Sequence, residues 1–264
     1  VNKRLGSFRL KDISIEIPDG YICALVGQNA SGKTTLIKMI LGLCRPDDGT
    51  VVIDGLNYQE AESEKRIRDI TGIVPVNELM NSELSLLENG RCYGRFYSRY
   101  DESIYMEYLE RFGLDRKIKF GKLSKGQKIK AQFAFALSTD PKYLILDEPT
   151  AGLDPKERAR FRNILSTLSK NRIVILSTHI VSDIESNANQ VILLKERKLY
   201  RMDTVSNICK TLDGKVYEGV VEDRAFDAFQ DTHLILSVRQ EQEHMQVRYY
   251  SSKPEEGSRN CTPN

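Results

Sequence analysis

The feature that most constrains the fold of this chain is the glycine-bounded stretch GQNASGKTT at residues 27–35. Apolar residues at 21–26 precede it, and apolar residues at helical spacing follow it within 36–41, so the pattern predicts a strand, a tight loop and a helix. Gly27 and Gly32 allow the backbone N–H groups of the loop to point inward and surround phosphate oxygens. The helix that follows directs the positive end of its dipole toward the same oxygens. The stretch therefore predicts a site for the phosphates of a nucleotide.

Two side chains of this stretch add a positive charge and a metal ligand. Lys33 can reach the β- and γ-phosphates, and the hydroxyl of Thr34 is placed to bind Mg²⁺. The residues expected to contact the nucleotide are Gly27, Asn29, Ala30, Ser31, Gly32, Lys33, Thr34 and Thr35. The alternative is a chance match, and the strand–loop–helix context argues against it.

The composition is that of an ordinary folded globular protein. Of 264 residues, 40% are hydrophobic and 29% are charged, and the length allows one large or two unequal domains. The 39 basic and 37 acidic residues leave a net charge of +2, so no nucleic-acid partner is expected. The five cysteines include no C-x2-C pair, which favours reduced thiols and a cytoplasmic setting. No apolar stretch approaches the ~18 residues of a membrane span, and no signal peptide is expected.

Strand and helix patterns alternate along much of the chain. Beside the strand before the loop, apolar runs predict strands at residues 8–17, 50–54, 70–74, 143–146, 173–177 and 191–194. Helical spacing predicts helices at residues 60–69 and around Phe161, Ile164, Leu165 and Leu168. Such alternation is typical of an α/β fold with a mostly parallel sheet that helices cover on both faces.

The region between about residues 76 and 140 has a different character. Helical periodicity runs through residues 84–97, 103–112 and 126–138, and no strand pattern interrupts it. We therefore expect a helical subdomain inserted into the α/β domain.

The last part of the chain predicts a small α+β appendage at residues 205–264, beside a main domain at 1–204. Short strands are predicted at residues 216–221, 234–238 and 247–250, with a helix at 223–229. The polar residues 251–264 predict a disordered tail. The appendage could regulate the protein, stabilise a dimer or serve as a structural lid.

A second motif carries chemistry at residues 144–148, LILDE. It reads as a buried strand that ends in two carboxylates, and ligands of open parallel sheets lie beyond the carboxyl ends of the strands. Asp147 is therefore placed to hold Mg²⁺ opposite Thr34. Glu148 lies one residue further and can orient or deprotonate an attacking water. The alternative is a strand that ends in acidic, turn-favouring residues, and the phosphate loop makes the functional interpretation the better one.

Three further motifs give the chain a resemblance to a known family. The sequence LSKGQ at residues 123–127 resembles the LSGGQ signature of ABC-type ATPases, AGLD at 151–154 resembles their D-loop, and STH at 177–179 resembles their histidine switch. All motifs occur in the family's order over roughly residues 8–200. The resemblance implies a P-loop NTPase core whose helical subdomain carries the signature.

The resemblance also implies roles in a dimer that holds ATP between its two chains. Ser124, Gly126 and Gln127 would close over the γ-phosphate of ATP bound by a second copy, His179 would contact that γ-phosphate, and Asp154 would couple the two sites. Ser124 stands where a helix begins, so it could equally be an ordinary N-cap. His179 could be a simple surface histidine, although its position among the other phosphate elements favours the functional interpretation.

The chain departs from the family pattern at three places. Lys125 replaces the first glycine of the signature. Leu5 stands where relatives usually present an aromatic residue to the adenine, and Phe8 could substitute for it. Val76 stands where a glutamine is expected, and valine can bind neither Mg²⁺ nor water.

The resemblance implies an ATP-hydrolysing subunit of an ABC transporter at the cytoplasmic face of the membrane, with ATP and Mg²⁺ bound and a separate membrane permease subunit. The signature, the D-loop and the short helical insertion are similar to those of ABC-2-type exporters of drugs or antimicrobial peptides. One alternative is a soluble ABC-type ATPase that acts in assembly, translation or DNA maintenance. A nucleotide-sensing regulator is another, and the intact set of Lys33, Asp147, Glu148 and His179 argues against it.

Overall fold

A computed structural model of the chain describes residues 1–58, 60–151, 153–168, 172–241, 244–255 and 257–262. The chain divides into two compact units, Val1–Asp203 and Thr204–Asn264. Each unit has its own sheet and its own core, and each is described by itself.

A six-stranded sheet forms the centre of the first unit, in the order β10-β9-β3-β8-β7-β6. Its strands are β3 (Ile22–Gly27), β6 (Thr71–Val74), β7 (Tyr143–Asp147), β8 (Ile173–Ser177), β9 (Gln190–Lys195) and β10 (Lys198–Asp203). All neighbours pair in parallel except β10, which pairs antiparallel with β9. The predicted α/β class with a mostly parallel sheet is confirmed.

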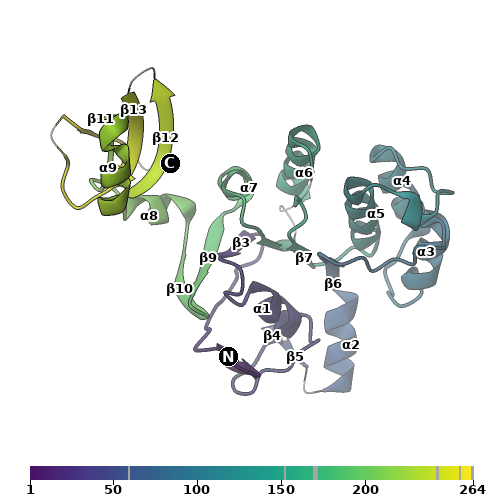
Figure 1. Cartoon of the computed structure of the whole chain (residues 1–264). Helices are drawn as coiled ribbons and strands as arrows, with labels where there is room; N and C mark the ends of the chain where they lie inside the picture. The colour runs from purple at the N-terminus through teal and green to yellow at the C-terminus, as the bar shows by residue number, and fades with distance from the viewer. Residues whose placement is uncertain (59, 152, 169–171, 242–243, 256, 263–264) are drawn as a thin grey trace. The chain divides into compact units, whose positions relative to one another are not determined.

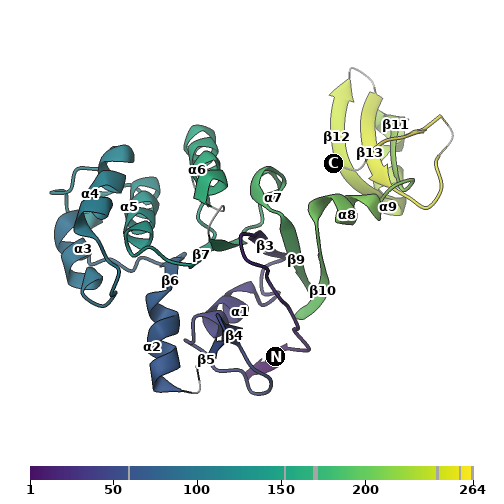
Figure 2. The same ribbon diagram turned by 180° about the vertical axis from the view of Figure 1, so that it is seen from behind.

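Helices cover both faces of this sheet. Successive side chains of a strand point to opposite faces, so the continuous apolar strands present apolar side chains on both faces. Leu144 and Leu146 pack with Phe161 of α6 (Pro155–Leu168), whereas Ile145 between them packs with Leu36 of α1 (Lys33–Ile40). Figures 1 and 2 show α6 and α7 (Val181–Asn187) on one side of the sheet and α1 on the other. Continuous apolar strands are therefore buried on both faces.

The predicted strand at residues 8–17 is wrong in its extent. Only β2 (Phe8–Leu10) forms, and it pairs in a hairpin with β1 (Lys3–Leu5). Asp12 has a left-handed φ of 53° and donates its N–H to the side chain of Asn2, which ends the ladder. Ile13 is nonetheless only 2% exposed. The alternation of apolar residues over 8–17 therefore indicates burial and not strand pairing.

Residues 50–74 form a second hairpin and a helix before the sheet resumes. β4 (Val52–Ile53) pairs with β5 (Leu56–Asn57), so the strand expected over 50–54 is shorter than predicted. α2 (Ala61–Asp69) follows and leads into β6.

No strand forms between residues 76 and 140, all of which the structure describes. The region contains α3 (Leu86–Gly94), α4 (Glu102–Arg111), a 3₁₀ turn (Phe120–Lys122) and α5 (Lys125–Ser138), so the predicted helices are present. Ala131 and Ala134 of α5 pack in the core of these helices, whereas Phe133 packs against α6 and the central sheet. α5 thereby joins the helical region to the sheet.

The second unit is a four-stranded antiparallel sheet in the order β12-β13-β11-β14. Its elements are α8 (Val205–Lys210), β11 (Val216–Glu222), a 3₁₀ turn (Asp223–Ala225), α9 (Phe226–Thr232), β12 (Leu234–Glu241), β13 (His244–Tyr250) and β14 (Arg259–Asn260). Its small core centres on Tyr217, Val247 and Tyr249. The polar end, for which the sequence predicts disorder, therefore carries a short strand that pairs with Tyr217 and Glu218 of β11.

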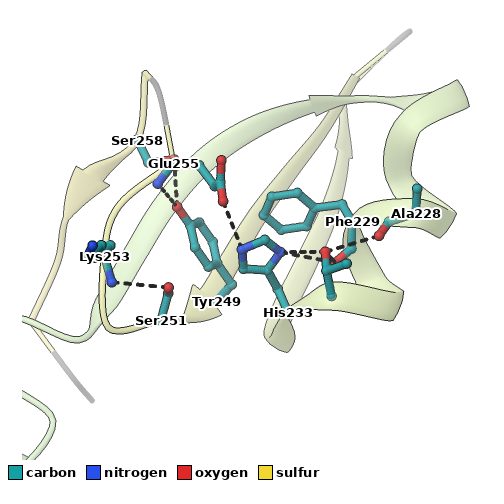
Figure 3. Close-up of polar contacts among 9 residues, drawn as sticks. Ala228, Phe229, His233, Tyr249, Ser251, Lys253, Glu255 and Ser258 are labelled. Carbon is teal, nitrogen blue, oxygen red and sulfur yellow. Dashed lines mark hydrogen bonds and ion pairs between the residues drawn. The ribbon is translucent and has the colours of Figure 1, made fainter.

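Single polar contacts hold this end of the chain in place. Figure 3 shows the ring of His233 stacked on Phe229 at 4.2 Å and turned edge-on to Tyr249, with Nε2 3.1 Å from Oε1 of Glu255. The hydroxyl of Tyr249 accepts from the N–H of Glu255 and donates to Ser258, each over 2.9 Å. Such contacts leave no periodic pattern in the sequence.

Candidate nucleotide site

The phosphate loop joins the end of β3 to the start of α1, as the sequence predicts. Ala30 and Gly32 have left-handed φ values of 61° and 111°, and the N–H of Ser31 donates to the carbonyl of Gln28 over 3.1 Å. A Cβ on Gly27 would lie 2.6 Å from the carbonyl oxygen of Leu194, and this oxygen belongs to backbone that cannot easily move. The loop therefore depends on glycine at both of its ends.

Lys33 is the cation at the centre of this loop and is only 9% exposed. Its Nζ donates to the carbonyls of Gly27 at 2.7 Å and Gln28 at 3.2 Å. An ammonium carries three protons, so phosphate oxygens could join or replace these carbonyls. Gly32 caps α1 without a side chain, and the hydroxyl oxygen of Ser31 is buried without a hydrogen-bond partner in the described chain. Uncapped amides, a buried hydroxyl and an ammonium together fit a phosphate group.

The acidic pair lies on the neighbouring part of the same sheet edge. Asp147 ends β7 with 7% exposure and pairs with Ser177 of β8. Glu148 follows with a left-handed φ of 51°, and its N–H donates to the carbonyl of Ser177 over 3.0 Å. Because β3, β8 and β7 are parallel neighbours, the phosphate loop and this pair lie at the same edge, on either side of β8.

The structure brings His179 directly to Glu148. Nδ1 of His179 lies 2.8 Å from Oε2 of Glu148, although the two residues are 31 positions apart. An ionised carboxylate only accepts hydrogen bonds, so a hydrogen bond here requires the tautomer of His179 that has its proton on Nδ1. His179 is 63% exposed and Glu148 only 18%, so the pair reaches from a sheltered carboxylate to the surface.

Mg²⁺ would need ligands beyond the protein at this edge. Within the described residues, no group of three or more His, Cys, Asp or Glu side chains could hold a metal ion. Mg²⁺ keeps several waters and usually takes one or two protein ligands plus the phosphates of its substrate. Thr34, which is exposed on α1, and Asp147 supply one hydroxyl and one carboxylate, and this donor set fits that coordination.

The signature residues form a helix cap in this structure. Ser124 caps α5 and accepts from the N–H of Gln127 over 3.3 Å, while Oε1 of Gln127 accepts from the N–H of Ser124 over 2.9 Å. The ordinary N-cap interpretation is therefore realised. A phosphate could still contact the exposed start of the helix. Within the described part of the chain, no hydrogen bond or ion pair joins residues 124–127 to residues 27–35.

The D-loop lies against the signature of its own chain. A Cβ on Gly126 would lie 3.0 Å from the side chain of Leu153, which is itself 7% exposed. Asp154 accepts from the N–H of Glu157 over 2.8 Å and thus caps the start of α6. Gly152 of the predicted D-loop lies outside the described residues.

Phe8 rather than Leu5 lies beside the phosphate loop. A Cβ on Gly32 would lie 3.5 Å from the ring of Phe8, and the guanidinium of Arg197 lies 5.2 Å from the centre of that ring. Leu5 is 48% exposed on β1. The aromatic residue that the family pattern lacks at position 5 is therefore available from the paired strand.

Sequence reasoning missed two polar residues that shape residues 76–80. Gln132 of α5 is 4% exposed and accepts from the N–H of Leu79 over 2.9 Å. Lys128, one turn earlier on the same helix, pairs with Glu78 at 2.7 Å. A glutamine on the apolar side of a helix was the available signal. Val76 and Leu79 are left 57% and 54% exposed.

Comparison with known proteins decides the family. The sequence pattern of the family described as "ABC transporter" matches residues 10–151, more than half of the chain. The chain belongs to this ABC transporter family. The resemblance seen in the sequence is thereby confirmed, and the fold is that of an ATP-binding domain.

Relatives of this ABC protein include transporter components of different kinds. An uncharacterised ABC transporter ATP-binding protein, YdbJ of Bacillus subtilis, is 31% identical over 86% of this chain and 75% of its own length. The Nod factor export ATP-binding protein I of Burkholderia lata is 32% identical over 74% of this chain and 66% of its own length. The energy-coupling factor transporter ATP-binding protein EcfA2 of Symbiobacterium thermophilum is 33% identical over 74% and 71%.

A solved structure supports the same conclusion for the fold and the nucleotide. The ATP-binding cassette MJ0796, determined as a dimer in a post-hydrolysis state with ADP and Pi, is 25% identical with a TM-score of 0.70. The match covers 77% of this ABC protein and 95% of the cassette.

Proposed function

We propose that this chain is the ATP-hydrolysing subunit of an ABC transporter that exports its cargo through a separate membrane subunit. The observation that carries the proposal is the meeting of Glu148 with His179 at 2.8 Å, beside a phosphate loop whose lysine is already oriented. Residues 1–204 would form the ATPase domain and residues 205–264 the appendage.

In this proposal the phosphate loop binds ATP through its amides and Lys33, and Thr34 and Asp147 hold Mg²⁺. Mg²⁺, when bound, neutralises charge on the phosphate oxygens. Glu148 takes a proton from the attacking water, and its sheltered position keeps it oriented for this step. His179 directs its exposed ring toward the γ-phosphate.

A second copy would complete the site. Ser124, Gly126 and Gln127 lack any polar contact with the phosphate loop of their own chain within the described residues, so a partner's phosphate is a suitable ligand for the start of α5. Asp154, at the start of α6, would couple the two sites. The dimer with ADP and Pi formed by the related cassette supports this arrangement.

The exposed apolar residues Val76 and Leu79 are suited to contact the membrane subunit. They project from a segment that Gln132 and Lys128 hold in place, so force on that segment would reach α5 and the signature. None of the helices in the described part of the chain has both the length and the apolar character of a membrane span. In this proposal the protein lies at the cytoplasmic face of the membrane and is bound there through its partner.

The direction of transport rests on the relatives. One of them is named for Nod factor export and another for an energy-coupling factor transporter, and the short helical insertion favours export. A cytosolic ATPase without transport is the weaker alternative, since these relatives are all named as transporter components.

Purification from native membranes tests the proposal. The tagged chain should copurify with a polypeptide that has several membrane spans. Replacing Val76 and Leu79 with aspartate should abolish the copurification, whereas Leu43→Asp, at an apolar position that is 67% exposed, should not. Recovery of the chain without any membrane polypeptide, or equal recovery with all variants, would contradict the proposed partner.

A further inference from the structure

Asp183 is a buried carboxylate that the roles above do not use. It lies on α7 with 1% exposure, and its Oδ2 accepts a 2.5 Å hydrogen bond from the hydroxyl of Thr150, which is also 1% exposed. Its Oδ1 accepts no hydrogen bond in the described part of the chain, and a guanidinium nitrogen of Arg162 lies 3.8 Å away. Burying a carboxylate costs free energy unless the carboxylate is paired, so the buried position of Asp183 suggests that this residue has a function.

The contact joins the two loops that carry the proposed chemistry. Thr150 lies two residues after Glu148, in the turn that leaves β7, and Asp183 lies four residues after His179, in the helix that follows β8. The segments that follow β7 and β8 are thus joined by these two side-chain contacts. The contact between Glu148 and His179 lies near the surface, whereas the contact between Thr150 and Asp183 lies below it.

Glu148 needs this support because its backbone is strained. Its φ of 51° is in the left-handed region, which a non-glycine residue holds only when its surroundings impose it. The N–H of Ala151 donates to the carbonyl of Glu148 and the N–H of Leu153 donates to that of Thr150, each over 3.1 Å. These turns fix the loop internally. Glu148 also contacts Ser177 and His179, and the hydroxyl of Thr150 adds a buried contact with α7.

The geometry points to Asp183 as a positioning residue for ATP hydrolysis, acting through Thr150 on Glu148 and His179. The inference rests on the proposed roles of Glu148 and His179. It predicts that Asp183 affects the chemical step and not ATP binding, because the contacts of the phosphate loop are with β2, β3, α1 and β9 and not with α7. When Glu148 and His179 turn toward water and the γ-phosphate, the buried contact keeps their loops in register.

Steady-state ATP turnover by the purified full-length chain tests the inference. Asp183→Ala should lower kcat by about 10- to 100-fold, since a shift of ~1 Å in a catalytic group can reduce the rate by that amount. KM for ATP should change by less than about twofold, as expected for an interaction that matters only in the transition state. Thr150→Val keeps the size of the side chain but removes the donor, and it should lower kcat similarly.

Conservative variants separate positioning from general stability. Asp183→Asn keeps the acceptor and Thr150→Ser keeps the donor of this hydrogen bond. Each variant should therefore have a kcat within about threefold of that of the unaltered protein. Combining Asp183→Ala with Thr150→Val should lower the rate little further than either change alone, because both remove the same contact. Glu185→Ala, an exposed change on the same helix, is the matched control and should leave turnover unaltered.

Glu148→Gln is measured in parallel, so that the two hypotheses fail differently. If Glu148→Gln retains normal turnover, the proposed role of Glu148 is wrong. If Glu148→Gln is inactive but Thr150→Val keeps kcat within about twofold, the positioning role alone is wrong. Equal losses of kcat and ATP affinity, together with a lower melting temperature, would also overturn it. If Asp183→Ala does not fold, Thr150→Val and Thr150→Ser decide the matter.

Discussion

Replacing Glu148 with glutamine is the most informative single change for the proposed mechanism. Glutamine keeps the size of the side chain, and its carbonyl oxygen can still accept from Nδ1 of His179 across the 2.8 Å contact. What is lost is the ability to take a proton from water. A general base contributes about 10²–10⁴-fold to the rate, or about 2.7–5.4 kcal/mol of barrier.

The structure places the expected loss in the upper part of that range. Glu148 is 18% exposed, so bulk water has little access to replace it as the base. We therefore expect kcat to fall by about 10³-fold or more. ATP affinity should change little, because Lys33 and the loop carbonyls that orient it do not contact Glu148.

Stalled hydrolysis should leave a dimer with ATP trapped between its chains. Light scattering of the Glu148→Gln protein should show a monomer without nucleotide and a dimer at saturating Mg·ATP. Adding Ser124→Arg should restore the monomer, because arginine would occupy the space that the partner's phosphate needs at the start of α5. A monomer at saturating ATP, or turnover within about threefold of the unaltered protein, would refute the reasoning.

Three further changes test separate parts of the site. Lys33→Ala should weaken ATP binding at least about tenfold, since a hydrogen bond to a charged group is worth about 1.5–3 kcal/mol; titration with labelled ATP measures this, and unchanged binding would remove the phosphate loop from the site. If the ring of Phe8 beside Gly32 stacks on adenine, Phe8→Ala should weaken ATP binding by about 2- to 10-fold. Leu5→Ala, at the exposed position, should leave ATP binding unchanged, and competition with labelled ATP measures both variants. Burial raises the pKa of the Cys23 thiol to about 12, so iodoacetamide at pH 8 should label the other cysteines of the native protein and reach Cys23 only after unfolding. Peptide mass spectrometry would identify the labelled cysteines, and rapid labelling of native Cys23 would contradict its burial in β3.

Much of the fold and of the phosphate loop could be predicted from the sequence, because their determinants are local. Gly27, Gly32 and Lys33 stand within one short segment, and the backbone conformation of that segment is what we propose binds phosphate. Continuous apolar runs predicted the buried parallel strands, and helical spacing predicted α3, α4 and α5. The family followed from motifs that are each contiguous in the chain.

Predictions from local sequence pattern were wrong where the pairing of a strand depends on residues that are distant in the sequence. Residues 8–17 alternate like a strand, yet the ladder ends once Asp12 turns to the left-handed region. β10 and β14 were missed because they are edge strands with many polar residues, and only their neighbours β9 and β11 make them strands. The sequence offered a helix cap at Ser124 as one of two interpretations, and only the structure shows that the amides of Ser124 and Gln127 are used in that cap.

The site itself was decided by the order of strands in the sheet. Placing β8 between β3 and β7 brings His179 to Glu148, and it joins Thr150 to Asp183 beneath them. The pattern of hydrophobic residues indicates which residues of a single helix or strand are buried. It contains no information about which strands are neighbours in the sheet. The residues that we propose to carry the chemistry could therefore be identified in the sequence, whereas their contacts with one another are determined only by the tertiary structure.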